Sequence, residues 1–387
     1  MTAGQAGQAD APATADEAEG RAGKAGVPAP AAAAATGIVH PWNAAPPEGE
    51  AAEVAPGILW MRLPLPMRLD HVNCYALREP DGWTIVDTGF DTPAARAVWQ
   101  RLMDGPLEGA PVRRVLVTHH HPDHVGLAGW FMQQGAALLA SRTAWLMARM
   151  LQLDVQERPT PQQVCFWRRA GMDSAQLARR GAERPVNSAD VTHPLPLGYT
   201  RVCEGQTLHL GGRDWHVAVG HGHAPEHLVL FGADADLVIG GDQLLPGISP
   251  NLGVHATEPG ANPVQDWLDS CAHLAPLANA RQLILPGHKL PYRGLPERLA
   301  QLAENHESAL ARLAASLAER PRTAADCFDV LFRRRIGEGE YGLALVEAVA
   351  HVNALAARGL ACEIGLTPEG GVIWGAPAGR DSAAHFG

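Results

Sequence analysis

The sequence predicts an α/β protein in which two β-sheets are packed between helices. Short apolar runs with strand character occur in two groups, and segments with helical spacing accompany each group. Several of these runs end abruptly in polar turns that contain His or Asp. Strands and helix, followed by strands and helix again, are typical of two sheets whose outer faces are covered by helices.

The expected elements follow one another in a regular order. The first group of strands consists of apolar runs bounded by polar, Gly or Pro-containing turns, at residues 58–63, 72–77, 83–86 and 115–117. A helix is expected from Thr92 to Met103, and residues 141–185 have mostly helical character. The second group of strands covers residues 206–210, 215–219, 228–231, 237–239 and 283–285.

The C-terminal part of the chain has a different texture. Helical spacing is expected in three segments, which cover residues 302–317, 323–332 and 341–358. Thr323 is a suitable cap for the second of these helices. Two short strands, at residues 362–366 and 372–374, flank a turn rich in Gly and predict a hairpin. Three helices and a hairpin describe a small winged-helix module.

The chain is therefore expected to consist of a tail, a main domain and a C-terminal module. Their expected bounds are residues 1–50 for a disordered Ala/Gly/Pro-rich tail, 51–300 for the main domain with a helical insert at 141–185, and 301–380 for the winged-helix-like domain. The first residues lack the basic start and Leu-rich core of a secretory signal, and no stretch approaches the length of a membrane span. A cytoplasmic protein without a membrane partner is expected.

Charge and cysteine content restrict the classes of function. The 387 residues carry a formal net charge of −10, which argues against non-specific binding to nucleic acid. The six cysteines are scattered without short-spaced pairs, so neither a disulfide framework nor a Cys-based zinc site is indicated. Hydrophobic residues make up 46% of the chain, enough for a large buried core.

One turn is unusually rich in groups that bind metals. His119, His121, Asp123 and His124 lie within six positions, directly after the strand-like run 115–117. Alternation along the chain places His119 and His121 on the same side, while Asp123 and His124 can face a neighbouring point. Imidazole nitrogen and carboxylate oxygen are ligands that zinc prefers, and this pattern suits two adjacent ions. The alternative is a polar surface loop that is rich in His.

Further candidate ligands stand at the ends of other strands. His223 follows a strand-like run in a Gly-His turn, with His221 as a weaker alternative, and His227 begins the next strand as a supporting residue. Asp242 follows the run 237–239, and its two carboxylate oxygens could bridge two metals. His288 closes the set in a Pro-Gly-His turn. Each turn is weak by itself, and the combination carries the signal.

Five motifs in this order resemble the metallo-β-lactamase superfamily. They are Asp87-Thr88-Gly89, His119-x-His121-x-Asp123-His124, Gly222-His223, Gly241-Asp242 and Pro286-Gly287-His288. The resemblance covers residues 53–294 and implies an αββα sandwich with a dinuclear site on one edge. The C-terminal module is similar to the winged-helix appendage of the lactamase-β-like hydrolases, some of which cleave RNA.

The resemblance also implies a role for each site residue. The first metal would be held by His119, His121 and His223, and the second by Asp123, His124 and His288, with Asp242 bridging the two. Asp87 would orient the ligand turn from behind without touching a metal. His120 is not expected to be a ligand. Zinc is the expected metal, and the same ligands suit iron or manganese.

The expected chemistry is hydrolysis by a metal-bound hydroxide, because two ions can share a water and lower its pKa toward neutrality. Asp123 is the candidate to orient the hydroxide and accept its proton. A small carboxylic substrate, a thioester, ester or lactone, is favoured by the acidic chain and by aromatic and apolar residues of the insert, which could line a pocket or merely pack the insert onto the sandwich.

Two alternatives come from other classes of function. A phosphodiesterase or ribonuclease could grip nucleic acid with the winged helix through Arg333, Arg334 and Arg335. Residues 301–387 contain eight Arg and no Lys against eleven acidic residues, so a solvated charged face is the preferred interpretation of that cluster. The module would then pack on the sandwich, shape the pocket or form a homodimer. A non-catalytic protein with a decayed site is disfavoured because all seven ligand positions are filled.

Overall fold

A computed structural model of the chain describes residues 37–233 and 236–377. Most of the expected tail lies outside these residues. Residues 37–50, which the sequence analysis assigned to the tail, are an exception because they pack against the sandwich. Val39 and Arg293 exchange backbone hydrogen bonds of 3.2 and 2.8 Å, and the ring of Trp42 lies edge-on to Trp60 with 6.2 Å between their centres. The expectation of disorder through residue 50 does not hold for this segment.

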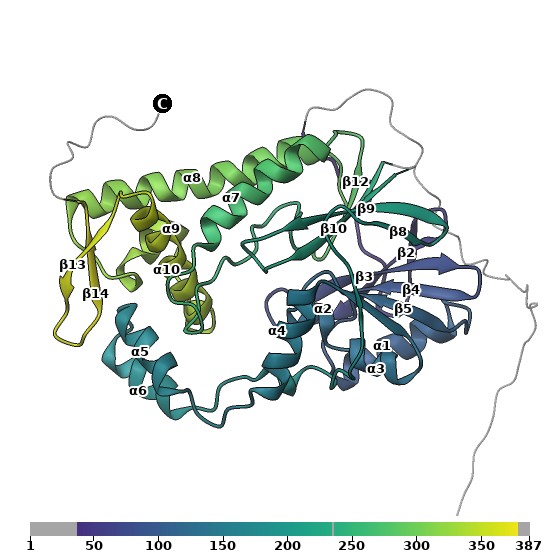
Figure 1. The fold of residues 1–387 in the computed structure, drawn as a ribbon, viewed down its shortest axis with the longest axis horizontal. Helices are drawn as coiled ribbons and strands as arrows, with labels where there is room; N and C mark the ends of the chain where they lie inside the picture. Colours follow the sequence, from purple (N-terminus) through teal and green to yellow (C-terminus); the bar gives the residue numbers. More distant parts are fainter. Residues whose placement is uncertain (1–36, 234–235, 378–387) are drawn as a thin grey trace, which may run out of the picture.

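Two large sheets pack face to face, as predicted, and lie in the right part of Figure 1. The first has the order β1-β2-β3-β4-β5-β6-β7 and consists of β1 (Ala52–Ala55), β2 (Ile58–Pro64), β3 (His71–Glu79), β4 (Gly82–Val86), β5 (Val112–Leu116), β6 (Ala137–Ala140) and β7 (Thr200–Arg201). The second has the order β12-β11-β10-β9-β8 and consists of β8 (Thr207–Leu210), β9 (Arg213–Gly220), β10 (His227–Gly232), β11 (Leu237–Gly241) and β12 (Leu283–Pro286). The sequence analysis missed the short strands β1, β6 and β7.

The four layers of an αββα sandwich are held together by separate apolar clusters. Between the sheets, Trp60, Leu77 and Leu116 of the first sheet pack with Trp215, Leu230 and Leu285 of the second. The outer face of the first sheet is covered by α1 (Pro93–Asp104) and α3 (Ala128–Gln133). The outer face of the second is covered by α7 (Pro263–Leu274) and α8 (Leu295–Glu319). Burial of these faces, about 25 cal/mol for each Å² of apolar surface, stabilises the fold.

Parallel pairing brings the functional turns to one edge of the sandwich. β4 pairs in parallel with β5, and β11 pairs in parallel with β12, so the carboxyl ends of both pairs point the same way within each sheet. Because each of these buried strands is rigid, the residues of the turn that follows it are held in fixed positions at this edge. The sequence pattern of apolar runs followed by His or Asp therefore has a direct structural basis.

The insert consists of α4 (Arg142–Leu153), α5 (Pro161–Arg169) and α6 (Ser174–Ala182), between the adjacent strands β6 and β7. The insert packs against the C-terminal region as well as against the sandwich. Phe166 of α5 is buried in the same cluster as residues of the C-terminal helices, and Ala325 donates a backbone hydrogen bond of 2.9 Å to Ala170. Trp145 stacks on Tyr199 at 4.9 Å. Phe166 and Trp145, which were considered as pocket lining, thus pack the insert against its neighbours.

The C-terminal region contains the three expected helices and the hairpin. The elements after α8 are α9 (Phe328–Phe332), α10 (Tyr341–Ala357), β13 (Cys362–Leu366) and β14 (Val372–Gly375), and β13 and β14 pair antiparallel. The second helix is shorter than expected, because residues 325–327 form a 3-10 turn and Arg333 ends the helix in the left-handed conformation. The winged-helix assignment stays a prediction.

The expected domain boundary at residue 300 falls inside α8. This helix begins at Leu295, after Gly294 with a φ of 97°, and Leu299 and Leu302 are buried with the second sheet's outer cluster. The same helix then packs against α9 and α10. One continuous helix therefore joins the sandwich to the C-terminal region. Among the described residues, no helix is both long and apolar enough to cross a membrane.

Candidate metal centre

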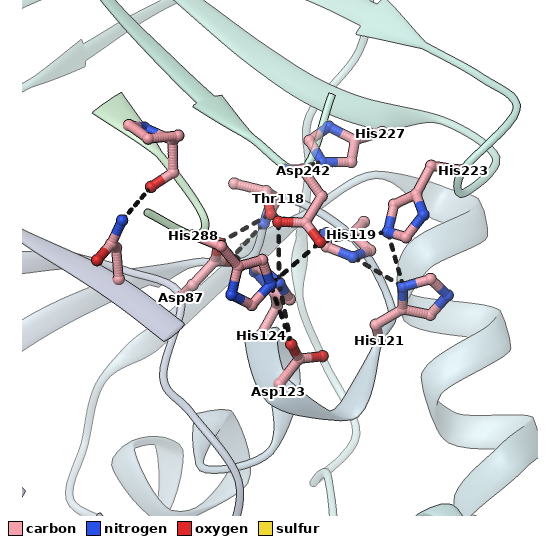
Figure 2. A network of polar contacts seen from close by, with 12 residues as sticks. Asp87, Thr118, His119, His121, Asp123, His124, His223, His227, Asp242 and His288 are labelled. Carbon is pink, nitrogen blue, oxygen red and sulfur yellow. Dashed lines mark hydrogen bonds and ion pairs between the residues drawn. The ribbon is translucent and has the colours of Figure 1, made fainter. Parts of the chain in front are cut away.

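The predicted site residues converge at the carboxyl edge of the two sheets (Figure 2). They come from turns that follow five different strands: Asp87 after β4; His119, His121, Asp123 and His124 after β5, the last two in the short helix α2 (Pro122–Val125); His223 after β9; Asp242 after β11; and His288 after β12. His119, His124 and His288 are at most 2% exposed. Residues that are far apart in the chain thus occupy one small buried volume.

Three imidazole nitrogens meet on one side of this volume. His121 Nδ1 lies 3.0 Å from His119 Nε2 and 3.0 Å from His223 Nε2. Burial, reinforced by the neighbouring imidazoles, holds the pKa values of His119 and His121 well below their usual range, so both rings are neutral. Three rings that aim nitrogens at one point offer a concentrated set of imidazole donors, which suits a zinc ion.

The second group combines imidazoles with carboxylates. Asp123 Oδ2 lies 3.5 Å from His124 Nε2 and 3.4 Å from His288 Nε2. Asp242 lies between the two groups, with Oδ1 3.4 Å from His124 Nε2, and Oδ2 3.4 Å from His223 Nε2 and 3.3 Å from His288 Nε2. Asp242 therefore faces ligands of both groups, the position expected of a bridge.

The geometry of the second group fits a cation better than internal hydrogen bonds. His124 Nε2 and Asp242 Oδ1 are buried, and neither has a hydrogen-bond partner within the described residues. Gly287 keeps the space open, because a Cβ at this position would overlap Asp242 Oδ1 and lie 2.8 Å from His124 Cε1. Buried polar atoms without partners are costly, so an arrangement that leaves two of them side by side indicates a binding function.

The charges of the second group are strongly coupled. Burial would lower the pKa of His288 and raise that of Asp242, but their mutual attraction outweighs both effects. The pKa of His288 rises to about 10, and that of Asp242 falls well below its usual range. The carboxylates of Asp242, Asp123 and Asp87 likewise outweigh burial and raise the pKa of His124. The site therefore stabilises positive charge, either as protons or as metal ions.

Asp87 lies behind the cluster and contacts its ligand turn through hydrogen bonds, while the orienting role that the family resemblance implies stays a prediction. Its Oδ1 accepts the backbone N–H of Thr118 at 2.8 Å, and its Oδ2 accepts from the Thr118 hydroxyl and from His124 Nδ1, both at 2.8 Å. The bond to Nδ1 leaves the lone pair of His124 on Nε2, the atom that faces the carboxylates. Asp87 has a φ of 58°, a conformation that Asp tolerates better than most residues and that aims its side chain into the turn.

Other contacts fix the remaining rings. His227 Nε2 accepts the backbone N–H of Asp242 at 3.1 Å, and its ring stacks on His119 at 4.6 Å. His288 Nδ1 donates to the carbonyl of His71 at 2.7 Å, and His223 Nδ1 donates to the carbonyl of Asn251 at 3.0 Å. The sequence analysis missed these two carbonyls, since any residue type can supply a carbonyl.

His120, which was not expected to be a ligand, and His221, the weaker alternative, lie outside the cluster. His120 Nδ1 is buried without a hydrogen-bond partner in the described part of the chain, and no ring nitrogen of His120 belongs to a group of converging ligand atoms there. His221 Nδ1 instead accepts the backbone N–H of Glu226 at 3.3 Å. Within residues 37–233 and 236–377, three groups of ligand atoms converge: His119, His121 and His223; His119, His124 and Asp242; and Asp123, His124 and His288. These groups contain the seven predicted ligands.

Comparison with known families agrees with this site. Residues 67–319 match the metallo-beta-lactamase superfamily, and residues 310–364 match the metallo-beta-lactamase-like C-terminal domain. The chain belongs to the metallo-β-lactamase superfamily. It is also 26% identical over 307 residues to a protein of Bacillus subtilis named "Probable metallo-hydrolase YqjP", and the match covers 78% of this chain and 92% of the relative. The protein is thus a metal-dependent hydrolase.

Two solved structures share most of the architecture. A beta-lactamase domain protein from Burkholderia ambifaria is 34% identical, with a TM-score of 0.79 over 88% of this chain and 97% of the relative. A metallo-beta-lactamase family protein from Thermus thermophilus is 27% identical, with a TM-score of 0.69 over 84% of this chain and all of the relative. Since the matches extend well beyond the sandwich, the C-terminal region belongs to the shared fold.

Proposed function

We propose that the protein is a dinuclear metal hydrolase that acts on a small carboxylic substrate, a thioester, ester or lactone. His119, His121 and His223 would hold the first ion, and Asp123, His124 and His288 the second, with Asp242 shared between the two sites. The observation that supports this assignment is the pair His124 Nε2 and Asp242 Oδ1, which are buried 3.4 Å apart without a hydrogen bond to any described residue, between the two groups. Zinc suits this set of nitrogen and oxygen ligands, as do iron and manganese.

A divalent metal bound by these residues would supply polarisation of the substrate carbonyl and a water of lowered pKa. We assign to Asp123 the roles of orienting that water and accepting its proton. Its side chain is 18% exposed, whereas that of Asp242 is 7% exposed. Oδ2 of Asp123 is directed at His124 and His288, which leaves Oδ1 as the acceptor of the proton. Removal of the proton as the oxygen attacks the carbonyl carbon is general base catalysis.

The surroundings of the cluster support a substrate with an apolar part. The first turn of α4 is tied to the turn after His223, because Thr143 N donates to Glu226 Oε2 at 2.7 Å. The same helix exposes Leu146, Met150 and Leu153 at helical spacing, with 52%, 45% and 71% of their surface accessible. An exposed apolar strip on a helix next to the site suits an acyl group better than a phosphodiester backbone.

The Arg cluster of the C-terminal region gives little support to nucleic-acid binding. Arg334 forms a two-point ion pair with Glu340, at 2.7 and 3.1 Å, and Glu340 also pairs with Arg68 of the sandwich at 2.9 Å. Cations that are neutralised by neighbouring carboxylates release few counterions from a phosphate backbone. These contacts instead tie the C-terminal region to the turn between β2 and β3.

A substrate panel tests the proposal. Zinc-loaded protein is offered acyl thioesters, aryl esters and lactones of graded chain length, beside bis(p-nitrophenyl) phosphate and short RNA. Asp123→Asn serves as the paired variant, since it removes the proton acceptor and retains the shape of the side chain. We expect carboxylic substrates to be hydrolysed and the variant to be slowed about 100-fold or more. Turnover of the phosphodiesters alone would overturn the substrate class and favour the phosphodiesterase alternative.

A further inference from the structure

The loop between β11 and α7 contacts both the metal centre and the C-terminal helix α10. In this loop, the carbonyl of Asn251 accepts a hydrogen bond from His223 Nδ1 at 3.0 Å. The side chain of the same residue points to α10, where Nδ2 donates to Glu347 Oε2 at 2.8 Å and to the carbonyl of Leu343 at 3.1 Å. Two successive contacts therefore connect α10 to a side chain of the proposed first metal site.

The contact to the carbonyl decides which nitrogen of His223 can bind a metal. A carbonyl oxygen only accepts, so Nδ1 carries the proton and the lone pair stays on Nε2. That atom faces His121 Nδ1 at 3.0 Å and Asp242 Oδ2 at 3.4 Å. If the carbonyl of Asn251 turned away, the ring could rotate or change tautomer, and the lone pair would leave the cluster.

The rest of the loop is anchored to α10 by other means. Val254 N donates to the carbonyl of Val346 at 3.1 Å, and Leu252 and Val254 are fully buried. Further along, Asn353 Nδ2 donates to the carbonyls of Pro259 and Ala261, both at 2.9 Å. These contacts hold the loop as a whole. Among these contacts, only the hydrogen bonds of the Asn251 side chain hold Asn251 itself, the residue whose backbone carbonyl accepts from His223.

The burial of the Glu347 carboxyl is energetically unfavourable, and its hydrogen bond to Asn251 gives a reason for an acidic residue at this position. Glu347 projects from α10 into a partly buried position beside the loop, and burial raises its pKa to about 7. An acidic side chain in such surroundings is unfavourable unless it is hydrogen-bonded. An apolar residue would fill the same place without that penalty, but it could not accept a bond from the Asn251 amide.

We infer that Asn251 and Glu347 are positioning residues for His223, through which the C-terminal region sets the affinity of the first metal site. The inference rests on the dinuclear site proposed above. Outer partners of ligating imidazoles commonly change metal affinity roughly 10- to 100-fold when they are removed. The first site should therefore depend on α10, whereas the second, whose His288 is oriented by the carbonyl of His71, should not.

Zinc titration of the full chain against a chromophoric chelator tests the inference, with Co2+ absorption as a second readout of ligand geometry. Asn251→Ala and Glu347→Leu should weaken one of two ions roughly 10- to 100-fold and leave the other within about threefold. Glu347→Gln should retain most of the affinity, because its amide oxygen can still accept from Asn251. Asn353→Ala is the matched control, since it removes two hydrogen bonds between α10 and the same loop but spares the Asn251 contacts.

The outcomes separate this inference from the proposed function. A wild-type chain that binds no ion overturns both. Two ions bound with wild-type affinity by Asn251→Ala and Glu347→Leu overturn the positioning role and leave the dinuclear site intact. Equal weakening in Asn353→Ala, or equal weakening of both ions, also overturns it, because either result means that the contacts only stabilise the fold. Selective loss of one ion, with rescue by Glu347→Gln, supports it.

Discussion

Replacement of Asp87 by Asn should weaken the second metal site while the turn keeps its shape. The Asn carbonyl can still accept the backbone N–H of Thr118, which lies 2.8 Å from Asp87 Oδ1. The other oxygen becomes an amide nitrogen, which can only donate. His124 Nδ1, 2.8 Å from that position, must then become an acceptor, so its proton moves to Nε2. Nε2 is the atom that faces Asp123 and Asp242.

The size of the effect follows from the bond that is lost. A hydrogen bond from a side chain to a buried carboxylate is worth about 1.5–3 kcal/mol, which corresponds to roughly a 10- to 150-fold change in binding. Loss of one outer partner of a ligating imidazole typically weakens a metal by a similar factor. We therefore expect the second ion to bind roughly 10- to 100-fold more weakly in Asp87→Asn and the first ion to be little affected.

Zinc titration with chelator competition measures both ions, and thermal unfolding in excess chelator shows whether the metal-free fold survives. Asp91→Asn is the control, because Asp91 lies in the same turn and contacts Arg96 at 2.6 Å and His193 at 3.3 Å, away from the cluster. The reasoning is refuted if Asp87→Asn binds both ions as tightly as the wild type. It is equally refuted if Asp91→Asn weakens the second ion to the same extent.

Three further outcomes are expected. Gly287→Ala should abolish binding of at least one ion, since the new methyl group overlaps Asp242 Oδ1. Gly260→Ala, where an added Cβ meets nothing within 4 Å, should bind as the wild type does, and metal analysis of both purified variants measures the difference. Chelation should lower the unfolding temperature, because an ion at about 1,000 times its dissociation constant stabilises by about 4 kcal/mol; a temperature unchanged by chelator would contradict a resident metal. Acid should destabilise the chelated protein below pH 6.5, the ordinary His value, because burial lowers the pKa values of His306 and His351 to about 3 and about 4. The unfolded chain then binds protons that the folded chain does not, which lowers the free energy of unfolding by up to about 1.4 kcal/mol per pH unit for each ring. The pH dependence should be weaker in His351→Leu, and an unchanged pH dependence would contradict this explanation.

Much of the fold could be predicted because its signals are local. Strands such as 83–86 and 237–239 are short apolar runs that end in polar turns, and their position is fixed by residues next to them in the chain. Short edge strands gave no such signal. β7 has two residues, both exposed, and is a strand only because it pairs with β6. Its existence depends on a partner that is distant in the chain.

The boundary at residue 300 was misplaced for a similar reason. Apolar residues recur at helical spacing from Leu302 onward, but this pattern does not show what the helix packs against. In the structure, the first turns of α8 cover the second sheet, while its later turns contact α9 and α10. A single rigid helix therefore belongs to both regions.

The sequence by itself indicated the candidate ligands, because metal chemistry depends on residue type and His or Asp at a strand end is visible without a structure. Only the tertiary structure decided how those ligands are oriented. The tautomers of His223 and His288 are set by the carbonyls of Asn251 and His71, which any residue could provide. The same holds for Glu347, whose role depends on where α10 packs and not on its neighbours in the chain.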